Sequence, residues 1–271
     1  MPTTATTPAA TTTAASQERY VIPNLRNACR ILKLLGRSSD GFKVADIGRK
    51  LSIPVTTTLR IMTTLHLEGL VRKNGTHYEL GPVLIQLGNA SLAGTEIRTT
   101  ALPVLERLTA KVAETSHLAI PCDNRSLIVA VQDSPHPLRA ASRPGFLAEL
   151  YCSSTGKTLL AFHHYPRLEE IVGSGPLARR TSHTISTLAD LHRDIEAIRK
   201  RGFSLDDEEF HLGVRCLAAP VFSSDGIAVA AMGITAATVR FTRERIPEMA
   251  VAVKAAAAEL SRLLGHAEAH A

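Results

Sequence analysis

The sequence predicts an α+β protein with a helical N-terminal domain and a C-terminal domain built on a mostly antiparallel sheet. Its 271 residues suffice for about two domains of ordinary size. Hydrophobic residues make up 45% of the chain, enough to fill two cores. Residues 19–81 hold 11 Lys and Arg against 4 Asp and Glu, whereas residues 82–271 hold 20 of each sign. A basic segment beside a neutral body indicates a polyanionic partner for that segment alone.

The start of the chain and the cysteines exclude several classes of protein. Residues 1–18 are dominated by Thr, Ala and Pro, which predicts a disordered tail. No run approaches the roughly 18 apolar residues of a membrane helix, and the first residues lack the basic-then-apolar pattern of a signal peptide. We therefore expect a cytoplasmic protein with no membrane partner. The four cysteines are widely scattered, so neither a disulfide scaffold nor a metal site is expected, and no motif calls for a cofactor.

Residues 19–81 predict three helices and a hairpin. Apolar residues recur at helical spacing in three segments, 24–36, 44–51 and 54–67. The pair Asn74-Gly75 lies between two short β-like runs and predicts a type I′ turn. This order of elements is that of a winged helix–turn–helix, whose third helix can enter the major groove of DNA.

The polar face of the third helix and the tip of the hairpin supply candidate DNA contacts. Threonine hydroxyls and a guanidinium can bond base edges and phosphates, and cations at the tip can reach backbone phosphates. The predicted DNA-binding residues are Thr56, Thr57, Arg60, Thr64, Arg72 and Lys73.

The remaining sequence predicts a linker helix in 82–95 and a second domain in 96–266. Strands are expected at 117–121, 127–132, 137–143, 216–222 and 227–235. Helices are expected at 96–115, where Pro103 should interrupt the helix, and at 155–164, 166–172, 188–201 and 242–264.

The segment Ser153–Thr158 resembles two catalytic motifs and completes neither. A phosphate-binding loop needs a glycine where Tyr151 stands. Ser154 and Lys157 form the Ser-x-x-Lys pair of one class of serine hydrolase, but the two partner motifs of that class are missing. That hydrolase remains the alternative function. We favour a helix start capped by Ser153 or Ser154, whose free N–H groups suit a carboxylate ligand.

An acidic run and a cysteine of the second half are further candidates for a site. The run Asp206–Glu209 is typical of a solvated loop, although it precedes a strand and at least one carboxylate could turn inward. Cys216 has no neighbouring histidine and is typical of a small buried residue.

Taken together, these features resemble the IclR family of bacterial transcription regulators, and the resemblance extends over residues 20 to about 265. The basic segment carries Asn24-x-x-Asn27-Ala28-x-x-Ile31-Leu32, Ala45-Asp46-Ile47, the third-helix start at 54–60 and Tyr78-x-Leu80-Gly81. The second half carries Gly156-Lys157-x-Leu159-Leu160-Ala161, Asp207-x-Glu209, the run Gly213–Phe222 and Ala230–Ile234.

The resemblance implies a winged-helix DNA-binding domain, a linker helix and an effector-binding domain similar to the GAF fold. It implies operator DNA as the partner, a homodimer or dimer of dimers, and a small organic acid as effector. Carried over by position, the effector-binding residues are Ser154, Thr155, Asp206, Cys216, Gly233, Thr235, Ala140 and Ala148. We also expect Met232 either to leave space for the carbon skeleton of the ligand or to belong to the core.

Two residues depart from the family pattern. Gly233 stands where some acid-binding members have serine, and Thr235 replaces a second serine. The missing hydroxyl at Gly233 removes a donor and adds room, which favours a ligand larger than the smallest keto acids. The sequence thus predicts a DNA-binding regulator, a repressor or activator of a catabolic operon, controlled by a small hydroxylated acid that could be aromatic. We expect no enzymatic activity.

Overall fold

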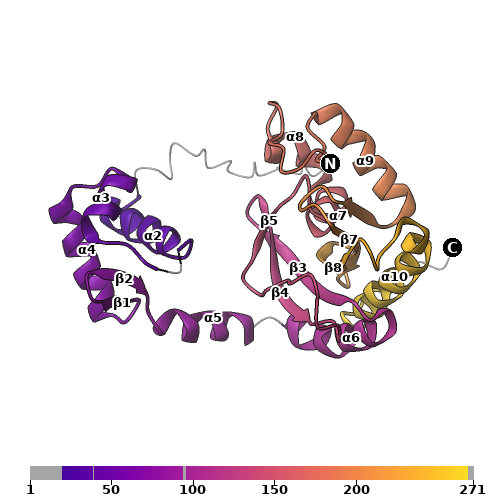
Figure 1. Ribbon diagram of the computed structural model, residues 1–271, viewed down its shortest axis with the longest axis horizontal. Coiled ribbons are helices and arrows are strands. Elements are labelled where there is room, and N and C mark those ends of the chain that lie inside the picture. The colour runs from indigo at the N-terminus through magenta and orange to yellow at the C-terminus, as the bar shows by residue number, and fades with distance from the viewer. Residues whose placement is uncertain (1–19, 39, 94–95, 268–271) are drawn as a thin grey trace, which may run out of the picture. The chain divides into compact units, whose positions relative to one another are not determined.

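The computed structural model describes residues 20–38, 40–93 and 96–267 (Figure 1). The predicted tail, residues 1–18, lies outside this range. The chain divides into two compact units, Met1–Ser91 and Leu92–Ala271. None of the described helices is long and apolar enough to cross a membrane.

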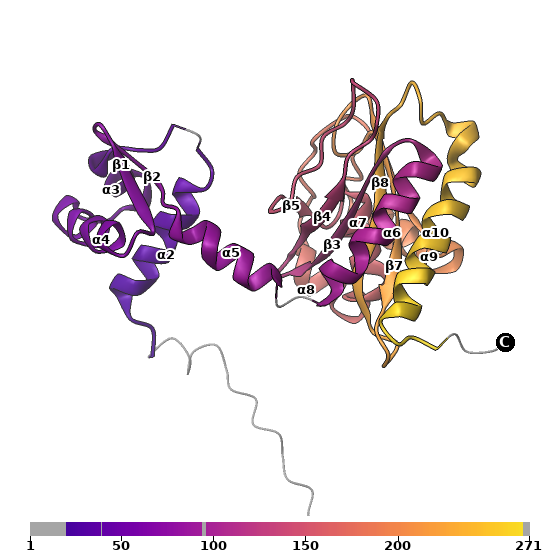
Figure 2. The ribbon, with the colours of Figure 1, turned by 90° about the horizontal axis from the view of Figure 1, so that it is seen from below.

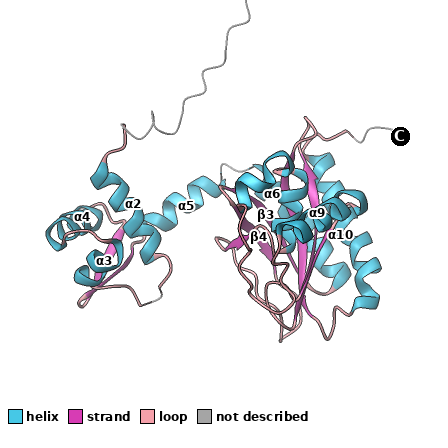
Figure 3. Ribbon diagram, turned by 90° about the horizontal axis from the view of Figure 1, so that it is seen from above, coloured by secondary structure: helices cyan, strands magenta, loops and turns pink. Residues whose placement is uncertain are grey.

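The first unit has the predicted order of helices followed by a hairpin (Figure 3). Its elements are α2 (Pro23–Leu35), α3 (Val44–Leu51), α4 (Val55–Leu67), β1 (Val71–Asn74) and β2 (His77–Leu80), followed by α5 (Val83–Ala93). The apolar stripes of the first three helices meet in one core with Ile31, Ile47, Met62 and Val71 at its centre.

A three-residue turn joins α3 to α4 and fixes the direction in which α4 begins. Ser52 ends α3 in the left-handed conformation, and the Ile53 N–H donates to the Gly48 carbonyl at 2.9 Å. A Cβ on Gly48 would lie 2.8 Å from the Ile53 oxygen, so glycine permits this close approach. Pro54 is the N-cap of α4, so the helix begins one residue later than the predicted range 54–67.

The hairpin differs in one detail from its prediction. Asn74 pairs with His77, so the two loop residues are Gly75 and Thr76 rather than Asn74 and Gly75. Of these two, Gly75 alone has a positive φ, whereas a type I′ turn requires a positive φ at both central residues. The type I′ prediction is therefore wrong, and Asn74 serves as a strand residue whose amide donates to Glu79.

The second unit contains a six-stranded antiparallel sheet in the order β5-β4-β3-β8-β7-β6. Its strands are β3 (Thr115–Cys122), β4 (Arg125–Gln132), β5 (Leu147–Glu149), β6 (Ser204–Asp207), β7 (Val214–Phe222) and β8 (Ala228–Ala237). Its helices are α6 (Glu96–Val112), α7 (Ser154–Phe162), α8 (Leu168–Val172), α9 (Leu188–Arg201) and α10 (Ile246–Leu263), with short 3-10 turns at Tyr165–Arg167 and Arg243–Arg245. The α+β prediction is confirmed.

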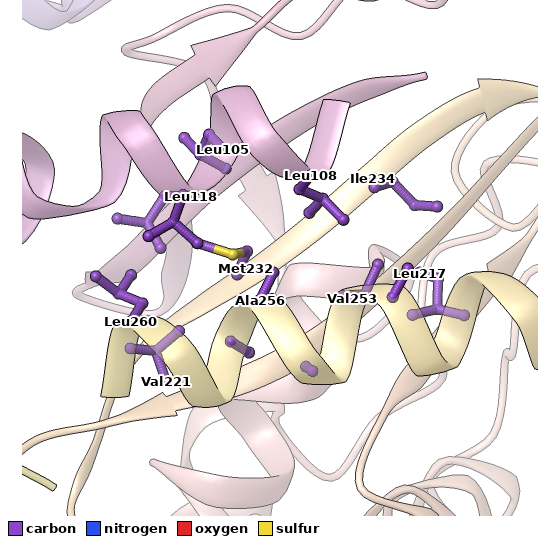
Figure 4. Packing of buried hydrophobic residues seen from close by; sticks show 14 of the residues in the cluster. Leu105, Leu108, Leu118, Leu217, Val221, Met232, Ile234, Val253, Ala256 and Leu260 are labelled. Atoms are coloured by element: carbon purple, nitrogen blue, oxygen red, sulfur yellow. The ribbon is translucent and has the colours of Figure 1, made fainter. Parts of the chain in front are cut away.

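Helices cover both faces of this sheet (Figure 2). Helices α6 and α10 pack side by side on one face, where Leu105 and Leu108 of α6 meet Val253 and Leu260 of α10 (Figure 4). Helices α7 and α9 pack on the other face, where they form a separate apolar cluster. Met232 is fully buried beneath α6 and α10, so of its two expected roles it has that of a core residue and does not open space in the ligand site.

Three segments of the second unit differ from their predictions. Residues 137–143 are not a strand, and Pro137 at their start has no N–H to donate to a ladder; the edge strand is β5. The strand β6 was missed because its polar sequence lacks the usual β-branched residues. Helix α6 continues through Pro103 and ends at Val112, since burial of Ala101 and Val104 against the sheet offsets the proline.

Gly156→Ala should destabilise the second unit. A Cβ on Gly156 would lie 2.5 Å from the Glu149 carbonyl oxygen and 2.6 Å from the Leu150 Cα, and backbone cannot move aside cheaply. We expect a loss of about 1–3 kcal/mol in the free energy of unfolding, measured by denaturant titration. Gly175→Ala is the control, because nothing lies within 4 Å of its added Cβ. Equal stability of the two variants would contradict this packing.

Candidate functional site

Helix α4 presents a polar surface opposite the core of the first unit. Thr58, Ile61, Met62 and Leu65 are buried on its inner face. The outer face carries the predicted contacts: Thr56, Arg60 and Thr64 are exposed, and Thr57 is half-buried. The Thr64 hydroxyl donates to the Arg60 carbonyl at 3.1 Å, which fixes its direction and leaves its oxygen free to accept.

The three predicted cations of the first unit differ in their surroundings. Within the described part of the chain, the Arg60 guanidinium has neither a hydrogen bond nor an ion pair. Arg72 is instead held across the hairpin by Glu79, with its Nε 3.0 Å from Oε2. Lys73 lies over the Tyr78 ring at 6.0 Å and has no carboxylate partner among the described residues. Arg60 and Lys73 are thus the cations most available to a polyanion.

A cavity of about 270 Å³ opens in the second unit, between the sheet, the start of α7 and the loop that precedes β5. Seven of the eight predicted effector residues line it: Ala140, Ala148, Ser154, Thr155, Asp206, Cys216 and Thr235. This volume lies just below the usual range for small-molecule sites, roughly 300–1,000 Å³, and therefore suits a small ligand.

Strand register brings four of the polar groups into one row. Thr115 pairs with Thr235, Thr235 pairs with Cys216, and Cys216 pairs with Asp206, across β3, β8, β7 and β6. The Thr235 hydroxyl donates to the Cys216 Sγ at 3.3 Å. Burial raises the pKa of the Cys216 thiol well above its usual range, as does the nearby Asp206, so Cys216 is a neutral wall residue rather than a nucleophile.

The start of α7 turns unsatisfied backbone donors toward the cavity. Ser153 caps the helix by accepting from the Gly156 N–H at 3.2 Å, as one of our two capping options predicted. The N–H groups of Ser154 and Thr155 have no partner among the described residues. Two bonds fix this end: Ser204 donates to the Ser154 carbonyl at 2.6 Å, and Ser126 donates to the Thr155 hydroxyl at 2.9 Å. The arrangement suits an anion.

Asp206 is buried on β6 rather than in a solvated loop. Its side chain is held by the backbone N–H groups of Glu209 and Phe210, which donate to Oδ1 at 2.8 and 3.2 Å. Burial raises the pKa of Asp206 to about 7, and the nearby Glu209 adds to the rise, whereas Lys157 opposes it. Near neutral pH this carboxyl can therefore either donate or accept a hydrogen bond.

Gly233 is the one predicted effector residue that does not line the cavity. It pairs with His117 of β3, and a Cβ built on it would lie 3.2 Å from the His117 Nε2 and 2.7 Å from the Leu217 oxygen. The room that glycine provides is thus taken by the His117 ring, which itself lines the cavity. Our expectation that this position adds space for the ligand is wrong.

Sequence reasoning missed several cavity residues because no motif marks them. His117 comes from a strand, and Arg143 and Phe146 come from the loop before β5, where side-chain direction depends on the fold. The Phe146 and Phe210 rings meet edge to face with centroids 6.0 Å apart and form an aromatic wall. Arg143 has no charged partner in the described structure, so it brings an uncompensated positive charge to the cavity.

The geometry of Lys157 disfavours the hydrolase alternative. The Lys157 ammonium is buried and bonds the Asp194 carboxylate at 2.8 Å and the Glu209 carboxylate. Burial opposes its charge, but the two carboxylates outweigh burial and hold the pKa of Lys157 above its ordinary value. A permanently protonated lysine cannot take the proton of the Ser154 hydroxyl. No described cluster of His, Cys, Asp and Glu could hold a metal ion.

Comparison with known proteins links both units to one family. Residues 25–75 match the family model described as the IclR helix-turn-helix domain. Residues 89–262 match the model of the bacterial transcriptional regulator IclR C-terminal domain, which is more than half of the chain.

Relatives match over nearly their whole length. The chain is 32% identical over 239 residues to the HTH-type transcriptional regulator BhcR of Paracoccus denitrificans, covering 88% of this chain and 85% of BhcR. It is 27% identical over 248 residues to the transcriptional repressor IclR of Escherichia coli, covering 90% of each chain. The crystal structure of IclR from Thermotoga maritima superposes with a TM-score of 0.69 at 31% identity, covering 90% of this chain and 99% of that one.

His117 should make the stability of the protein depend on pH. Burial lowers the pKa of His117 to about 4 from 6.5. Between these values the unfolded chain binds a proton that the folded chain does not, so stability rises as pH rises from about 4 to 6.5. In the His117→Gln variant, the free energy of unfolding should therefore rise by about 3 kcal/mol less than in wild type over this pH range. Denaturant titrations at several pH values measure the difference.

Asp206 acts in the opposite direction, because its raised pKa costs stability as pH rises from about 4 to 7. The wild-type curve therefore combines both slopes, and the difference between wild type and His117→Gln isolates the histidine. Parallel curves for the two proteins would show that His117 titrates normally in the folded state.

Proposed function

This chain belongs to the IclR family of bacterial transcription regulators, and we propose that it switches a catabolic operon when a small organic acid fills the cavity of the second unit. The chain is a ligand-responsive, DNA-binding transcriptional regulator. The relatives named as repressors include IclR of Escherichia coli and AllR of Salmonella typhimurium, which favours repression over activation here. A regulator of this kind works in the cytoplasm.

DNA contact is assigned to the outer face of α4 and to the hairpin. The support is that Thr56, Thr57, Arg60 and Thr64 form one polar face, opposite the core of the unit. Arg60 is the candidate for a base contact, since a free guanidinium can make a bidentate bond with guanine. Lys73 is assigned to a backbone phosphate. Arg72 should bind a backbone phosphate more weakly than Lys73 does, because its charge is already paired with Glu79.

The ligand is assigned as an acid because the charge of the cavity favours an anion. Arg143 carries an uncompensated positive charge, and the start of α7 adds two free N–H donors. Burial keeps His117 neutral and brings the pKa of Asp206 to about 7, so neither group fully cancels that positive charge. This charge balance is the observation that carries the assignment of the effector.

Regulation needs a coupling between this cavity and the DNA-binding face. The ligand must bind one conformation of the regulator better than the other, and such couplings are typically about 1–3 kcal/mol. We assign the linker role to residues 82–95, and the effector-binding domain to residues 96–266. One α4 covers few base pairs, so we propose a homodimer, or a dimer of dimers, on a pseudo-palindromic operator. The exposed Ile85 and Leu87 of α5 offer an apolar surface for pairing.

Arg60→Ala should weaken binding to the operator by about 1–3 kcal/mol, because it removes a bond to a base edge. Operator fragments selected from genomic DNA by the wild-type protein supply the probe for gel-shift titrations. Lys73→Ala should weaken binding to any sequence and reduce the salt dependence by about one phosphate. Lys200→Ala removes an exposed cation from the other unit and is the control. An Arg60→Ala variant with wild-type affinity would remove this residue from the interface.

Asp206→Ala should lose effector binding and keep DNA binding in the absence of ligand. Its carboxyl faces the cavity, and α4 belongs to the other unit. A calorimetric screen of organic acids against both proteins measures the loss, and gel shifts without ligand check DNA binding. Glu196→Ala, which removes an exposed carboxylate from α9, is the control. If Asp206→Ala binds the same acids as tightly as wild type, the effector lies elsewhere.

A further inference from the structure

One wall of the cavity is a loop with few attachments to the rest of the second unit. Residues 133–146 join β4 to β5, and the loop residues that line the cavity are Ala140, Ala141, Ser142, Arg143 and Phe146. Most of the loop is exposed, and the Leu138 side chain is 82% exposed, so apolar packing does little to hold it. Its position therefore depends on a few specific bonds.

Both ends of this loop are tied to neighbouring elements. At the first end, the Ser134 hydroxyl donates to the Ala113 carbonyl at 2.7 Å, and the Ser134 N–H donates to the Thr115 hydroxyl at 3.2 Å. At the other end, the Gly145 N–H donates to the Ile128 carbonyl at 2.8 Å. Any opening of the loop must therefore come from its middle part.

Arg240 holds that middle part. Its Nη1 donates to the Leu138 carbonyl at 3.1 Å, and the Thr115 hydroxyl donates to the Ala140 carbonyl at 3.3 Å. Within the described structure, no other bond from outside the loop reaches residues 135–144. A hydrogen bond from a charged group is stronger than one from a hydroxyl, so the bond from Arg240 is the main attachment.

A buried carboxylate fixes the Arg240 guanidinium in place. Glu114 lies between α6 and β3 and is only 1% exposed. Its two oxygens accept from Arg240, at 2.6 Å from Nε and 2.8 Å from Nη2. A planar guanidinium held along one edge presents its remaining nitrogen in a single direction, here toward the Leu138 carbonyl. Neither Glu114 nor Arg240 lines the cavity.

We propose that Arg240 is a positioning residue that clamps this loop over the cavity, so that access of the effector depends on an ion pair that the effector never touches. The inference rests on the proposed function for the identity of the cavity as the effector site. An effector that displaces Arg143 or Phe146 would strain the clamp, which is anchored at the end of α6. The clamp therefore connects a wall of the cavity to the helix that follows the linker in sequence.

Two measurements on the full-length protein test the clamp without an effector. Trypsin can cut after Arg139, which lies between the two tied carbonyls, only when the loop opens locally. N-Ethylmaleimide can reach Cys216, which lines the cavity, only through the cavity, and peptide mapping by mass spectrometry resolves each labelled cysteine. Labelling of wild type should be slow, because burial raises the pKa of the Cys216 thiol.

Arg240→Lys is the main variant. Lysine keeps a positive charge beside Glu114, but its single ammonium cannot also reach the Leu138 carbonyl. We expect cleavage after Arg139 and labelling of Cys216 to become about tenfold faster than in wild type, because the loop loses one bond from a charged group. Lysine also remains a site for trypsin, so the substitution adds or removes no cleavage site.

Further variants and sites are the controls. Thr115→Val removes the hydroxyl that ties Ala140, leaves the ion pair intact, and should accelerate both reactions about threefold. Arg193→Lys changes an exposed ion pair of α9 and should change neither reaction. Cleavage after Arg179, in another exposed loop, and labelling of Cys122 should be equal in all proteins. Thermal unfolding shows that each variant is folded, and Thr115→Val decides the test if Arg240→Lys is not.

Three results would overturn the clamp. The first is a wild-type rate of both reactions in Arg240→Lys. The second is faster cleavage with unchanged labelling of Cys216, which would show that the loop does not control access. The third is equal acceleration at Arg179 and Cys122, since Arg240 would then support the whole unit. The proposed function is judged separately: if no organic acid binds or changes the affinity for operator DNA, that function fails, whereas the two rates still decide the clamp.

Discussion

The alternation of side chains along β8 is the constraint on which the second unit depends. This central strand has a covered face on each side, so each of its residues must belong either to the core or to the opposite layer. Met232 and Ile234 point into the core beneath α6 and α10 (Figure 4), and Ala236 belongs to the same core cluster. Gly233 and Thr235 point the other way, toward His117 and Cys216. A shift of one residue in register would exchange the core and the cavity floor.

Buried polar bonds hold α7 at a fixed distance from that floor. Ser204 lies at the centre of them: it bonds the Thr158 hydroxyl at 2.8 Å and the Ser154 carbonyl at 2.6 Å. Lys157 adds an ion pair with Asp194 and Glu209 one turn along the helix. Glu209 in turn donates its backbone N–H to Asp206. The network therefore joins the start of α7 to a cavity carboxyl, and a ligand that moves either group would disturb the other.

Charged and polar groups of the chain differ in whether their hydrogen bonds and ion pairs are already made within the fold. Lys157, the Ser-Thr bonds of α7 and the Arg72–Glu79 pair are satisfied internally, so they stabilise the fold and have little left to offer a partner. His117 Nδ1 is buried without a partner in the described structure. Arg143 and Arg60 likewise lack charged partners there. Arg143 and Arg60 are the cations that the proposed function assigns to a ligand and to DNA.

The sequence by itself determined the helices of the first unit, the basic charge of that unit, the α+β class and the family. These follow from local patterns: apolar residues at helical spacing, turn residues between them, and a specific run such as Gly213–Phe222. It also placed seven cavity residues in one site, through resemblance rather than through spacing. Tertiary structure decided the rest. Strand register decides whether Met232 faces the core or the cavity. The pairing of the two hairpin strands brings Glu79 opposite Arg72, where the two form an ion pair. The pairing of His117 with Gly233 joins residues 116 positions apart, and no local pattern can reveal a contact that only the packing of two strands creates.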